Sequence, residues 1–393
     1  MPILPIIKLK IARNTNHPWI FQKMVEKPDA KAANGSVVDI VDRDNKWVGR
    51  GLYNGHSRIA LRVLTSTQTE EIDEAFFERK ITQAVELRRN ILRLDTTTDA
   101  YRLIHSEADG LSGLVVDKLG NTLVMEFFSS GMYRLKDFIV SALKKYFPES
   151  QFFWFADNHV QKQESFVCRE PEYALNPETI KENGVIFKVF PGQGHKTGFF
   201  ADQRENRLQT SQYCEGKSVL DLCCNTGGFS IYAKTLGKAE EVTALDLDEE
   251  ALAAAKQTAS LNKVRIRFVQ TDIFPWLRDA IAQGLKFDVV ILDPSKLTRD
   301  REEVEQALRK YTDMNRLAMQ VVANGGMLLT CSCTGLVSEV NFLDSIRRAA
   351  WQAGKTAQWV KIAGAGPDHP VMAHAGEGRY LKAVFCRILD GTL

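Results

Sequence analysis

Carboxylates and glycines stand where three successive apolar segments of the C-terminal half end. The positions are Asp221, Gly227 and Gly228 after the first segment, Asp246 after the second and Asp272 after the third. Carboxylates at such positions accept hydrogen bonds from ribose hydroxyls and an exocyclic amine, and glycines let the backbone approach a ligand closely. Because the segment is not G-x-G-x-x-G, a dinucleotide diphosphate site is poorly supported. The pattern indicates a nucleoside held by carboxylates, and S-adenosylmethionine (SAM) fits that description.

These three turns supply most of the residues that we expect to bind SAM. Strand-end aspartates are also common helix caps, and Gly-Gly is a common tight turn. Several such positions in the right order nevertheless favour a cofactor site over separate structural roles. The expected SAM-binding residues of these turns are Asp221, Asn225, Thr226, Gly227, Gly228, Phe229, Asp246, Asp272 and Ile273.

The fourth and fifth apolar segments are followed by residues of a different kind, an acid and two thiols. The sequences are Asp293-Pro-Ser-Lys after the fourth segment and Cys331-Ser-Cys-Thr-Gly after the fifth. C5 of a pyrimidine is too weak a nucleophile to attack a sulfonium directly, so a thiolate must first add to C6. We predict that Cys333 is this nucleophile. Asp293 is expected to hydrogen-bond the base edge around N3 as charge develops there. Ser295 and Lys296 are expected to contact the substrate.

The nucleophilic Cys needs help to ionise, because a free thiol has a pKa of about 8.5. A helix N-terminus, a cation or the substrate would serve, and Lys296 is one candidate cation. We expect Cys331, on the strand side of the loop, to be structural, because a buried Cys behaves as a small hydrophobe. The seven cysteines form no paired CxxC knuckles, so neither a disulfide framework nor a metal site is expected.

A polar segment, GHKTGFFADQRENR over residues 194–207, precedes the first of these strands. Aromatic and basic side chains together can line a nucleotide site. We expect Lys196 to contact the substrate and Phe200 to line the cofactor site. The competing interpretation is a capped helix with a salt-bridged face.

The elements that must position these residues alternate regularly from about residue 192 to the end. The apolar runs SVLDL, EVTALD, IRFVQ, FDVVIL, GMLLT, AQWVKIA and LKAVFCRI are separated by amphipathic helical runs. This alternation predicts an α/β fold with a parallel, doubly wound sheet, in which ligands bind beyond the carboxyl ends of the strands.

The 393 residues are too many for one ordinary core and suggest several domains. Short strands with turn signals predict a small β-barrel over residues 1–70, and helical spacing followed by a hairpin predicts an α+β domain over 71–190. Residues 191–393 are expected to form the third domain.

Residues 1–70 hold 11 Lys and Arg against 6 Asp and Glu, while the remainder holds 40 against 43. A basic module favours a polyanion partner such as nucleic acid. Neither a membrane span nor an export signal is indicated, so we expect a cytoplasmic protein.

The motifs together resemble a known family, the bacterial large-subunit ribosomal RNA methyltransferases of type I. The shared segments, in order, are HPWIF, YRLIHSEADGLSGLVVDKLGN, GHKTGFFADQRENR, DLCCNTGGFS, LDPSK, LLTCSCTGL, and DHPV followed by EGRYLK. The resemblance covers almost the whole chain, from about Leu9 to Leu389. It implies SAM-dependent formation of 5-methylcytosine in 23S rRNA by a protein with an N-terminal PUA domain, a central α+β domain and a C-terminal Rossmann-like methyltransferase domain.

Transferred by position, the resemblance places the nucleophile at Cys333, the acid at Asp293, and the cofactor acids at Asp246 and Asp272. It adds two residues next to the cofactor, Gln203 and Arg204. This sequence departs from the family at two positions: Ser295 replaces the usual second Pro of DPPK, and Cys331 stands where an aromatic residue is common.

Other functions stay open at this point. A methyltransferase acting on a base amine usually stacks the base on an aromatic side chain after (D/N)PP, and here that position is Lys296. A non-catalytic RNA-binding or ribosome-assembly factor could keep the same fold. An oxidoreductase is the weakest alternative because the diphosphate signature is missing. The sequence also leaves open whether the chain forms a homodimer and which cytosine is the target.

Overall fold

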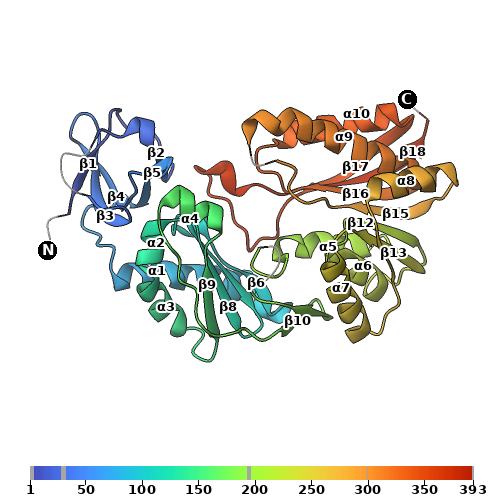
Figure 1. The fold of residues 1–393 in the computed structure, drawn as a ribbon, viewed down its shortest axis with the longest axis horizontal. Helices are drawn as coiled ribbons and strands as arrows, with labels where there is room; N and C mark the ends of the chain where they lie inside the picture. The colour runs from blue at the N-terminus through green and yellow to red at the C-terminus, as the bar shows by residue number, and fades with distance from the viewer. Residues whose placement is uncertain (1–3, 28–31, 193–195, 299, 392–393) are drawn as a thin grey trace. The chain divides into compact units, whose positions relative to one another are not determined.

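The computed structural model describes residues 4–27, 32–192, 196–298 and 300–391, so Gly194 and His195 of the polar segment lie outside the described residues. The chain divides into two compact units (Figure 1). Unit 1 holds Met1–Ile180, Val189–Ala201 and Pro367–Gly378; unit 2 holds Lys181–Lys188, Asp202–Gly366 and Arg379–Leu393.

The first part of unit 1 is a five-stranded sheet with the order β1-β3-β4-β5-β2. Its strands are β1 (Ile6–Lys8), β2 (Trp19–Phe21), β3 (Ser36–Val41), β4 (Trp47–Tyr53) and β5 (Ile59–Thr65). Alternate side chains of these strands, such as Val38 and Ile40, are buried in a small core of their own. Four of these strands fall in segments whose pattern predicts strands, IIKLKIA, SVVDIVD, KWVGRGLY and IALRVLT, whereas the pattern does not predict β2, in the HPWIF motif.

The second part of unit 1 is a four-stranded sheet, β6-β7-β8-β9, with helices packed against it. Its strands are β6 (Ala100–His105), β7 (Leu114–Leu119), β8 (Thr122–Phe127) and β9 (Gln151–Phe155), and its helices are α1 (Glu74–Val85), α2 (Ser130–Arg134), α3 (Lys136–Lys144) and α4 (Asn158–Glu164). The predicted hairpin across Gly120 is confirmed as β7 and β8. The amphipathic segment from Met132 to Phe147, whose spacing predicts one helix, is divided at Leu135 into α2 and α3.

The HPWIF motif fastens parts of unit 1 together. Trp19 Nε1 donates a hydrogen bond to Glu107 Oε1 at 2.8 Å, and His17 Nε2 lies 3.0 Å from Glu377 Oε2. Arg62 of β5 reaches Ser112 Oγ at 3.3 Å. These contacts support a structural role for the motif over stacking on RNA bases.

Unit 2 is built on a seven-stranded sheet with the order β14-β13-β12-β15-β16-β18-β17. The strands are β12 (Ser218–Leu222), β13 (Glu241–Asp246), β14 (Arg267–Gln270), β15 (Phe287–Leu292), β16 (Val322–Ser332), β17 (Lys355–Ala363) and β18 (Lys382–Asp390). The first five run parallel, as predicted. The prediction of an all-parallel sheet is wrong, because β18 lies antiparallel between β16 and β17.

Helices cover both faces of this sheet (Figure 1). One face carries α8 (Ile273–Ala282), α9 (Val304–Val321) and α10 (Glu339–Gln352), and the other carries α5 (Arg204–Ser211), α6 (Gly228–Thr235) and α7 (Glu249–Leu261). The hairpin of β10 (Glu178–Glu182) and β11 (Val185–Val189) runs from unit 1 into unit 2. Side-chain caps fix where helices begin, with Asp248 starting α7, Asp272 starting α8 and Ser338 starting α10.

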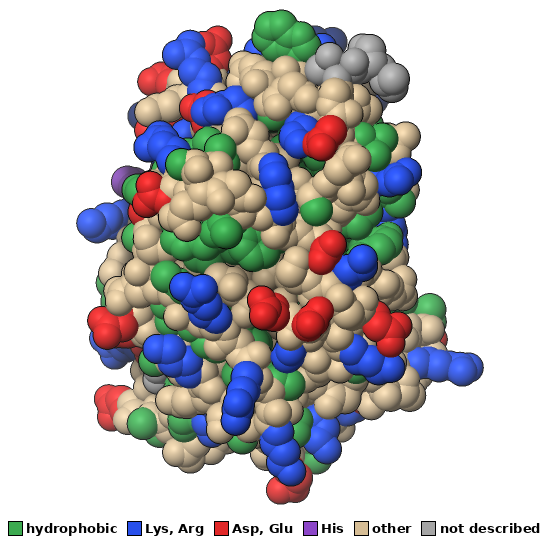
Figure 2. All heavy atoms as spheres, turned by 90° about the vertical axis from the view of Figure 1, so that its right-hand side faces the viewer, with side chains coloured by type: hydrophobic (Ala, Val, Ile, Leu, Met, Phe, Trp, Pro, Cys, Tyr) green, Lys and Arg blue, Asp and Glu red, His purple; other side chains and the backbone are tan. Residues whose placement is uncertain are grey.

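The surface mixes the two signs of charge. On the face that Figure 2 shows, both Lys and Arg side chains and Asp and Glu side chains are present. In the part of the chain that the structure describes, no helix is long and apolar enough to cross a bilayer.

Candidate active site

The strand order of unit 2 creates a topological switch point at the edge of the sheet where the parallel strands end. β12 pairs with β13 on one side and with β15 on the other, so the connections leaving β12 and β15 run to opposite sides. Ligands of doubly wound sheets bind at such a switch point, beyond the carboxyl ends of the strands. Three of the predicted site residues, Asp221, Asp246 and Asp293, lie at this edge.

The loop after β12 has the tight backbone that its glycines predict. Gly227 has φ of +77°, and a Cβ there would lie 3.1 Å from Cβ of Ala255. Cys223 and Asn225 also adopt positive φ, and the Asn225 side chain accepts a hydrogen bond from Thr226 N at 2.8 Å. The loop therefore turns sharply and brings its backbone, rather than bulky side chains, to the edge of the sheet.

Asp221 lies beneath this loop and is fully buried. Its Oδ2 accepts hydrogen bonds from Ser230 N at 3.1 Å and Ser230 Oγ at 2.5 Å, which fixes the start of α6. Its Oδ1 has no hydrogen-bond partner among the described residues, and burial raises the pKa of the carboxyl to about 7. An unsatisfied buried oxygen at this place is what a site for a donor group of SAM would leave.

Asp246 joins the ends of β12 and β13. Its carboxylate accepts hydrogen bonds from Asn225 N at 2.7 Å and from Asp248 N at 2.9 Å, and the residue is half-buried. Asp272 caps α8 through Phe274 N at 2.8 Å and is exposed, next to the buried Ile273. Both carboxylates keep acceptor capacity, because an ionised carboxylate has about four lone-pair sites. These carboxylates and the glycine loop fit SAM, which would be held through hydroxyl and amine donors.

The loops after β15 and β16 meet, as predicted. The Cys333 thiol lies 3.9 Å from the Pro294 carbonyl, toward which it donates, and Leu297 N donates to Thr334 Oγ1 at 3.2 Å. Cys333 is half-buried, whereas Cys331 is fully buried and its thiol pKa is raised well above the ordinary value by burial. Of the two thiols of the segment Cys331-Ser-Cys-Thr-Gly, Cys333 is therefore the more accessible one.

Asp293 is oriented from behind by α5 and the turn before it. Gln203 Nε2 donates to Asp293 Oδ2 at 3.0 Å, and Asn206 Nδ2 donates to Gln203 Oε1 at 2.7 Å. Asn206 also donates to the Gly364 carbonyl at 3.0 Å. This chain of hydrogen bonds decides which end of the Gln203 amide faces Asp293, so the polar residues before β12 do more than cap a helix.

The remaining predicted residues lie in different settings. Arg204 is almost fully buried, with Nε 3.1 Å from Glu205 Oε1, and Ser295 and Lys296 are exposed. Lys196 and Phe200 belong to unit 1, where the Lys196 ammonium lies 4.6 Å from the centre of the Phe200 ring. Their roles toward SAM or RNA stay predictions.

Two functional candidates escaped the sequence analysis. Lys382 of β18 donates hydrogen bonds from Nζ to carbonyls of the Cys333 loop, Thr334 at 2.7 Å and Val337 at 2.9 Å. Arg207 and Glu182 form a buried ion pair at 2.7 Å that ties the β10–β11 hairpin to α5. Lys382 lies in the segment LKAVFCRI and Arg207 in the polar segment 194–207, but the sequence alone does not show which strand or hairpin packs beside them.

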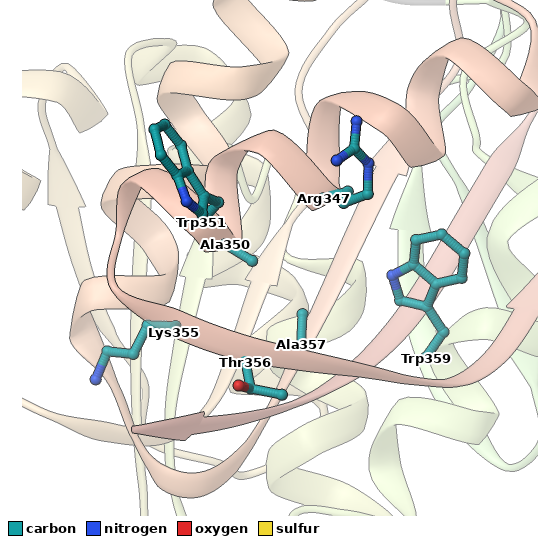
Figure 3. A pocket seen from close by; sticks show the side chains of 7 residues that line it. All are labelled: Arg347, Ala350, Trp351, Lys355, Thr356, Ala357 and Trp359. Atoms are coloured by element: carbon teal, nitrogen blue, oxygen red, sulfur yellow. The ribbon is translucent and has the colours of Figure 1, made fainter. Parts of the chain in front are cut away.

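A separate pocket of about 240 Å³ lies between the end of α10 and the start of β17 (Figure 3). Its two Trp side chains come from different elements, Trp351 from the helix and Trp359 from the strand. The lining residues are Arg347, Ala350, Trp351, Lys355, Thr356, Ala357 and Trp359. Because β17 runs in the same direction as β16, the start of β17 is at the opposite edge of the sheet from the switch point. It includes none of the predicted site residues.

Comparison with known proteins agrees with this geometry. Residues 12–66 match the model of a PUA-like domain, and residues 149–382 match that of an S-adenosylmethionine-dependent methyltransferase. Ribosomal RNA large subunit methyltransferase I of Escherichia coli K12 is 39% identical over 95% of this chain and 96% of that protein. The protein of the same name from Shigella boydii serotype 4 (strain Sb227) is 40% identical over the same shares.

Solved structures show the same fold. A crystal structure assigned as a methyltransferase and complexed with SAH has a TM-score of 0.82 at 21% identity, covering 98% of this chain and all of that one. A structure assigned as a SAM-dependent methyltransferase of Streptococcus mutans has a TM-score of 0.77 at 20% identity, covering 91% and 93%. With the matching family model and the near full-length relatives, the predicted fold class and cofactor are confirmed: this chain belongs to the ribosomal RNA large subunit methyltransferase I family of SAM-dependent methyltransferases.

Proposed function

We propose that this chain forms 5-methylcytosine in 23S ribosomal RNA, using Cys333 as a covalent nucleophile. The single observation that carries the mechanism is that the accessible Cys333 thiol lies next to the loop that holds Asp293. The Cys333 thiol is 3.9 Å from the carbonyl of Pro294, the residue after Asp293. The RNA substrate is supported by the rRNA methyltransferase relatives and by the PUA-like domain at residues 12–66. Such a protein would act in the cytoplasm, where bacterial ribosomes assemble.

The chain's own residues would carry the reaction as follows. The Cys333 thiolate adds to C6 of the cytosine, which makes C5 nucleophilic, while Asp293 hydrogen-bonds the base edge around N3. SAM, when bound, supplies an electrophilic methyl group, and SAH leaves. Loss of the C5 proton to a base then expels Cys333 from C6, which restores the thiolate and leaves 5-methylcytosine.

Two alternatives are weaker. A base-amine methyltransferase would stack the base on an aromatic side chain after Asp-Pro, and Lys296 there is exposed. A non-catalytic RNA-binding or assembly factor would have no use for the hydrogen-bonded chain that orients Asp293. SAM binding alone does not separate these roles, but the nature of the product does.

The test is methyl transfer from labelled SAM to unmodified 23S rRNA, with nucleoside analysis of the product. Wild type, Cys333→Ala and the matched control Cys331→Ala are compared. We expect 5-methylcytidine from wild type and from Cys331→Ala, and loss of product in Cys333→Ala by several orders of magnitude. A methylated adenosine or guanosine product, or full activity of Cys333→Ala, would overturn the proposed mechanism.

A further inference from the structure

A buried lysine is held directly against the loop that carries the proposed nucleophile. In the antiparallel pairing of β16 with β18, Lys382 is the register partner of Ser332, the residue before Cys333. Its Nζ donates to the carbonyls of Thr334 at 2.7 Å, Val337 at 2.9 Å and Tyr380 at 2.9 Å. Thr334 and Val337 both follow Cys333 in the chain after β16 ends at Ser332, so one ammonium group holds the loop at two main-chain carbonyls.

The charge of Lys382 is unusual among the buried cations of this structure. Lys382 is 2% exposed, and the hydrogen-bond acceptors recorded for its ammonium are neutral carbonyls. By contrast, buried Arg88 and Arg207 each face a carboxylate, Asp109 at 2.6 Å and Glu182 at 2.7 Å. An ammonium buried without an anion is costly, which favours the formation of a negative charge nearby.

The group positioned to supply that negative charge is the Cys333 thiol. Lys382 interacts electrostatically with Cys333 and with Glu339 of α10, and Glu339 already pairs with Arg379 at 2.6 Å. Burial lowers the pKa of Lys382 to about 8, and a thiolate at Cys333 acts in the opposite direction. The coupling is reciprocal, so the ammonium must favour the thiolate to the same extent.

Of the other groups around Cys333, the Asp293 carboxylate acts against ionisation of the thiol, whereas Cys331 and Tyr311 are neutral near pH 7 because burial raises the pKa of each. Asp293 comes from the loop after β15, Cys331 from β16 and the Tyr311 hydroxyl from α9, where it lies 2.9 Å from Thr334 Oγ1. A carboxylate beside a thiol raises the thiol pKa, so a cation is needed if Cys333 is to react near neutral pH.

We infer that Lys382 is a positioning residue that holds the Cys333 loop through main-chain carbonyls and stabilises the Cys333 thiolate. The inference rests on the proposed function, because that function makes Cys333 the nucleophile. It replaces Lys296, the cation suggested by sequence proximity, whose side chain is exposed.

The experiment measures the pKa of the Cys333 thiol in the full chain without RNA. The rate of alkylation by iodoacetamide is followed against pH by mass spectrometry of the Cys333 peptide. Cys331→Ala is the parent, so that this peptide holds one thiol. Lys382→Met removes charge and donors, Lys382→Gln keeps an N–H donor without charge, Lys382→Arg keeps the charge, and Lys296→Met is the matched control.

We expect the thiol pKa to rise by about one unit or more in both Lys382→Met and Lys382→Gln, and to stay near the parent value in Lys382→Arg and Lys296→Met. Methyl transfer by Lys382→Gln should then fall most near pH 7 and recover towards pH 9, which a purely structural defect would not produce. A thiol pKa that stays unchanged in both neutral variants overturns the inference. A rise in Lys382→Met alone also overturns it, because lost hydrogen bonds would then explain the effect.

The two proposals fail in different ways. If the thiol pKa responds to Lys382 while the parent makes no 5-methylcytidine, the inference stands and the proposed function is wrong. If the parent makes 5-methylcytidine while the thiol pKa is the same in the parent and in the neutral Lys382 variants, the proposed function stands and the inference is wrong.

Discussion

Gln203 donates a hydrogen bond from Nε2 to Asp293 Oδ2 at 3.0 Å, and Asn206 holds the other end of the same amide. The direction of the Gln203 side chain is therefore set before any substrate binds. Asp293 in turn keeps one oxygen restrained and presents its carboxyl group at the carboxyl end of β15. This relationship connects the polar segment before β12 to the proposed base-binding acid.

Replacing Gln203 by Glu should impair methyl transfer. The substitution keeps the size of the side chain but removes the N–H donor and sets a second carboxylate against Asp293. Hydrogen bonds to charged groups contribute about 1.5–3 kcal/mol, so we expect kcat/KM to fall about 10- to 100-fold. The matched control is Gln209→Glu on α5, the helix that follows Gln203, where Lys361 Nζ donates to the Gln209 side chain. Equal activity of the two variants would contradict the role given to Gln203.

Asp246 should contribute to SAM affinity beyond its structural role. Asp246→Ala removes the carboxylate that we expect to accept the ribose hydroxyls, so the Kd for SAM measured by titration calorimetry should rise about 10- to 100-fold. The control is the neighbouring cap, Asp248→Ala, which removes hydrogen bonds to Glu250 N and Ala251 N. It should lower stability by about 1 kcal/mol and leave the Kd for SAM unchanged. Similar changes of Kd in both variants would mean that only helix α7 had been disturbed.

Replacing Gly227 by Ala should lower the free energy of unfolding by more than the same change at an ordinary turn glycine. An Ala at position 227 would adopt a left-handed backbone and place Cβ 3.1 Å from Ala255. Gly216 also has a positive φ, of +67°, but a Cβ there meets nothing within 4 Å. We expect Gly216→Ala to cost about 1–2 kcal/mol from the backbone alone and Gly227→Ala to cost about 1 kcal/mol more. Urea unfolding of the two variants measures this difference, and equal destabilisation would argue against a crowded loop.

Sequence reasoning located the edge of the sheet where the site stands, because apolar segments and the residues that follow them are neighbours in the chain. β12, β13 and β15 end where the pattern places them: Asp221 lies one residue before the end of β12, Asp246 is the last residue of β13, and Asp293 follows β15. The pairing of β16 with β18 is different, since strand order is not encoded in periodicity. That is why Lys296, close in sequence, was considered as the cation, and Lys382 was missed.

The sequence pattern also does not predict where a helix is interrupted. The amphipathic pattern from Met132 to Phe147 continues through Leu135, yet the backbone there leaves the helical region and separates α2 from α3. A Cβ added at Gly131 would lie 2.9 Å from the Leu52 side chain, so α2 packs closely against the β4 strand, and this packing rather than its own periodicity places it. Packing between segments distant in sequence overrides the local signal at such positions.

Glu126 should make the stability of unit 1 fall as the pH rises. Burial raises the pKa of this carboxyl to about 7. Below the unfolded value of about 4.3 both states bind the proton, whereas between about 4.3 and 7 only the folded state does, so stability decreases across that range. Glu126→Gln should remove this slope and stabilise the unit at pH 8 by up to about 3 kcal/mol. Hydrogen exchange of the β8 amides measures the effect.

The control for Glu126 is Glu149→Gln, a change at an exposed carboxyl of the same unit. It should leave the pH dependence of β8 exchange as in wild type. If Glu126→Gln keeps the wild-type slope between pH 5 and 7, the buried carboxyl is not the group responsible.

The target cytosine should be unpaired or easily opened in the free RNA. Thiolate addition to C6 and methyl transfer to C5 approach the base from its faces, which neighbouring bases cover inside a stack. The half-buried Cys333 cannot reach such a base unless it leaves the helix, and opening a paired base costs a few kcal/mol. An RNA fragment with the target in a loop should therefore be methylated about 100-fold faster than the same fragment closed by a complementary strand, in parallel assays with labelled SAM. Equal rates on both substrates would mean either that the enzyme opens the helix itself or that the reacting atom is not C5.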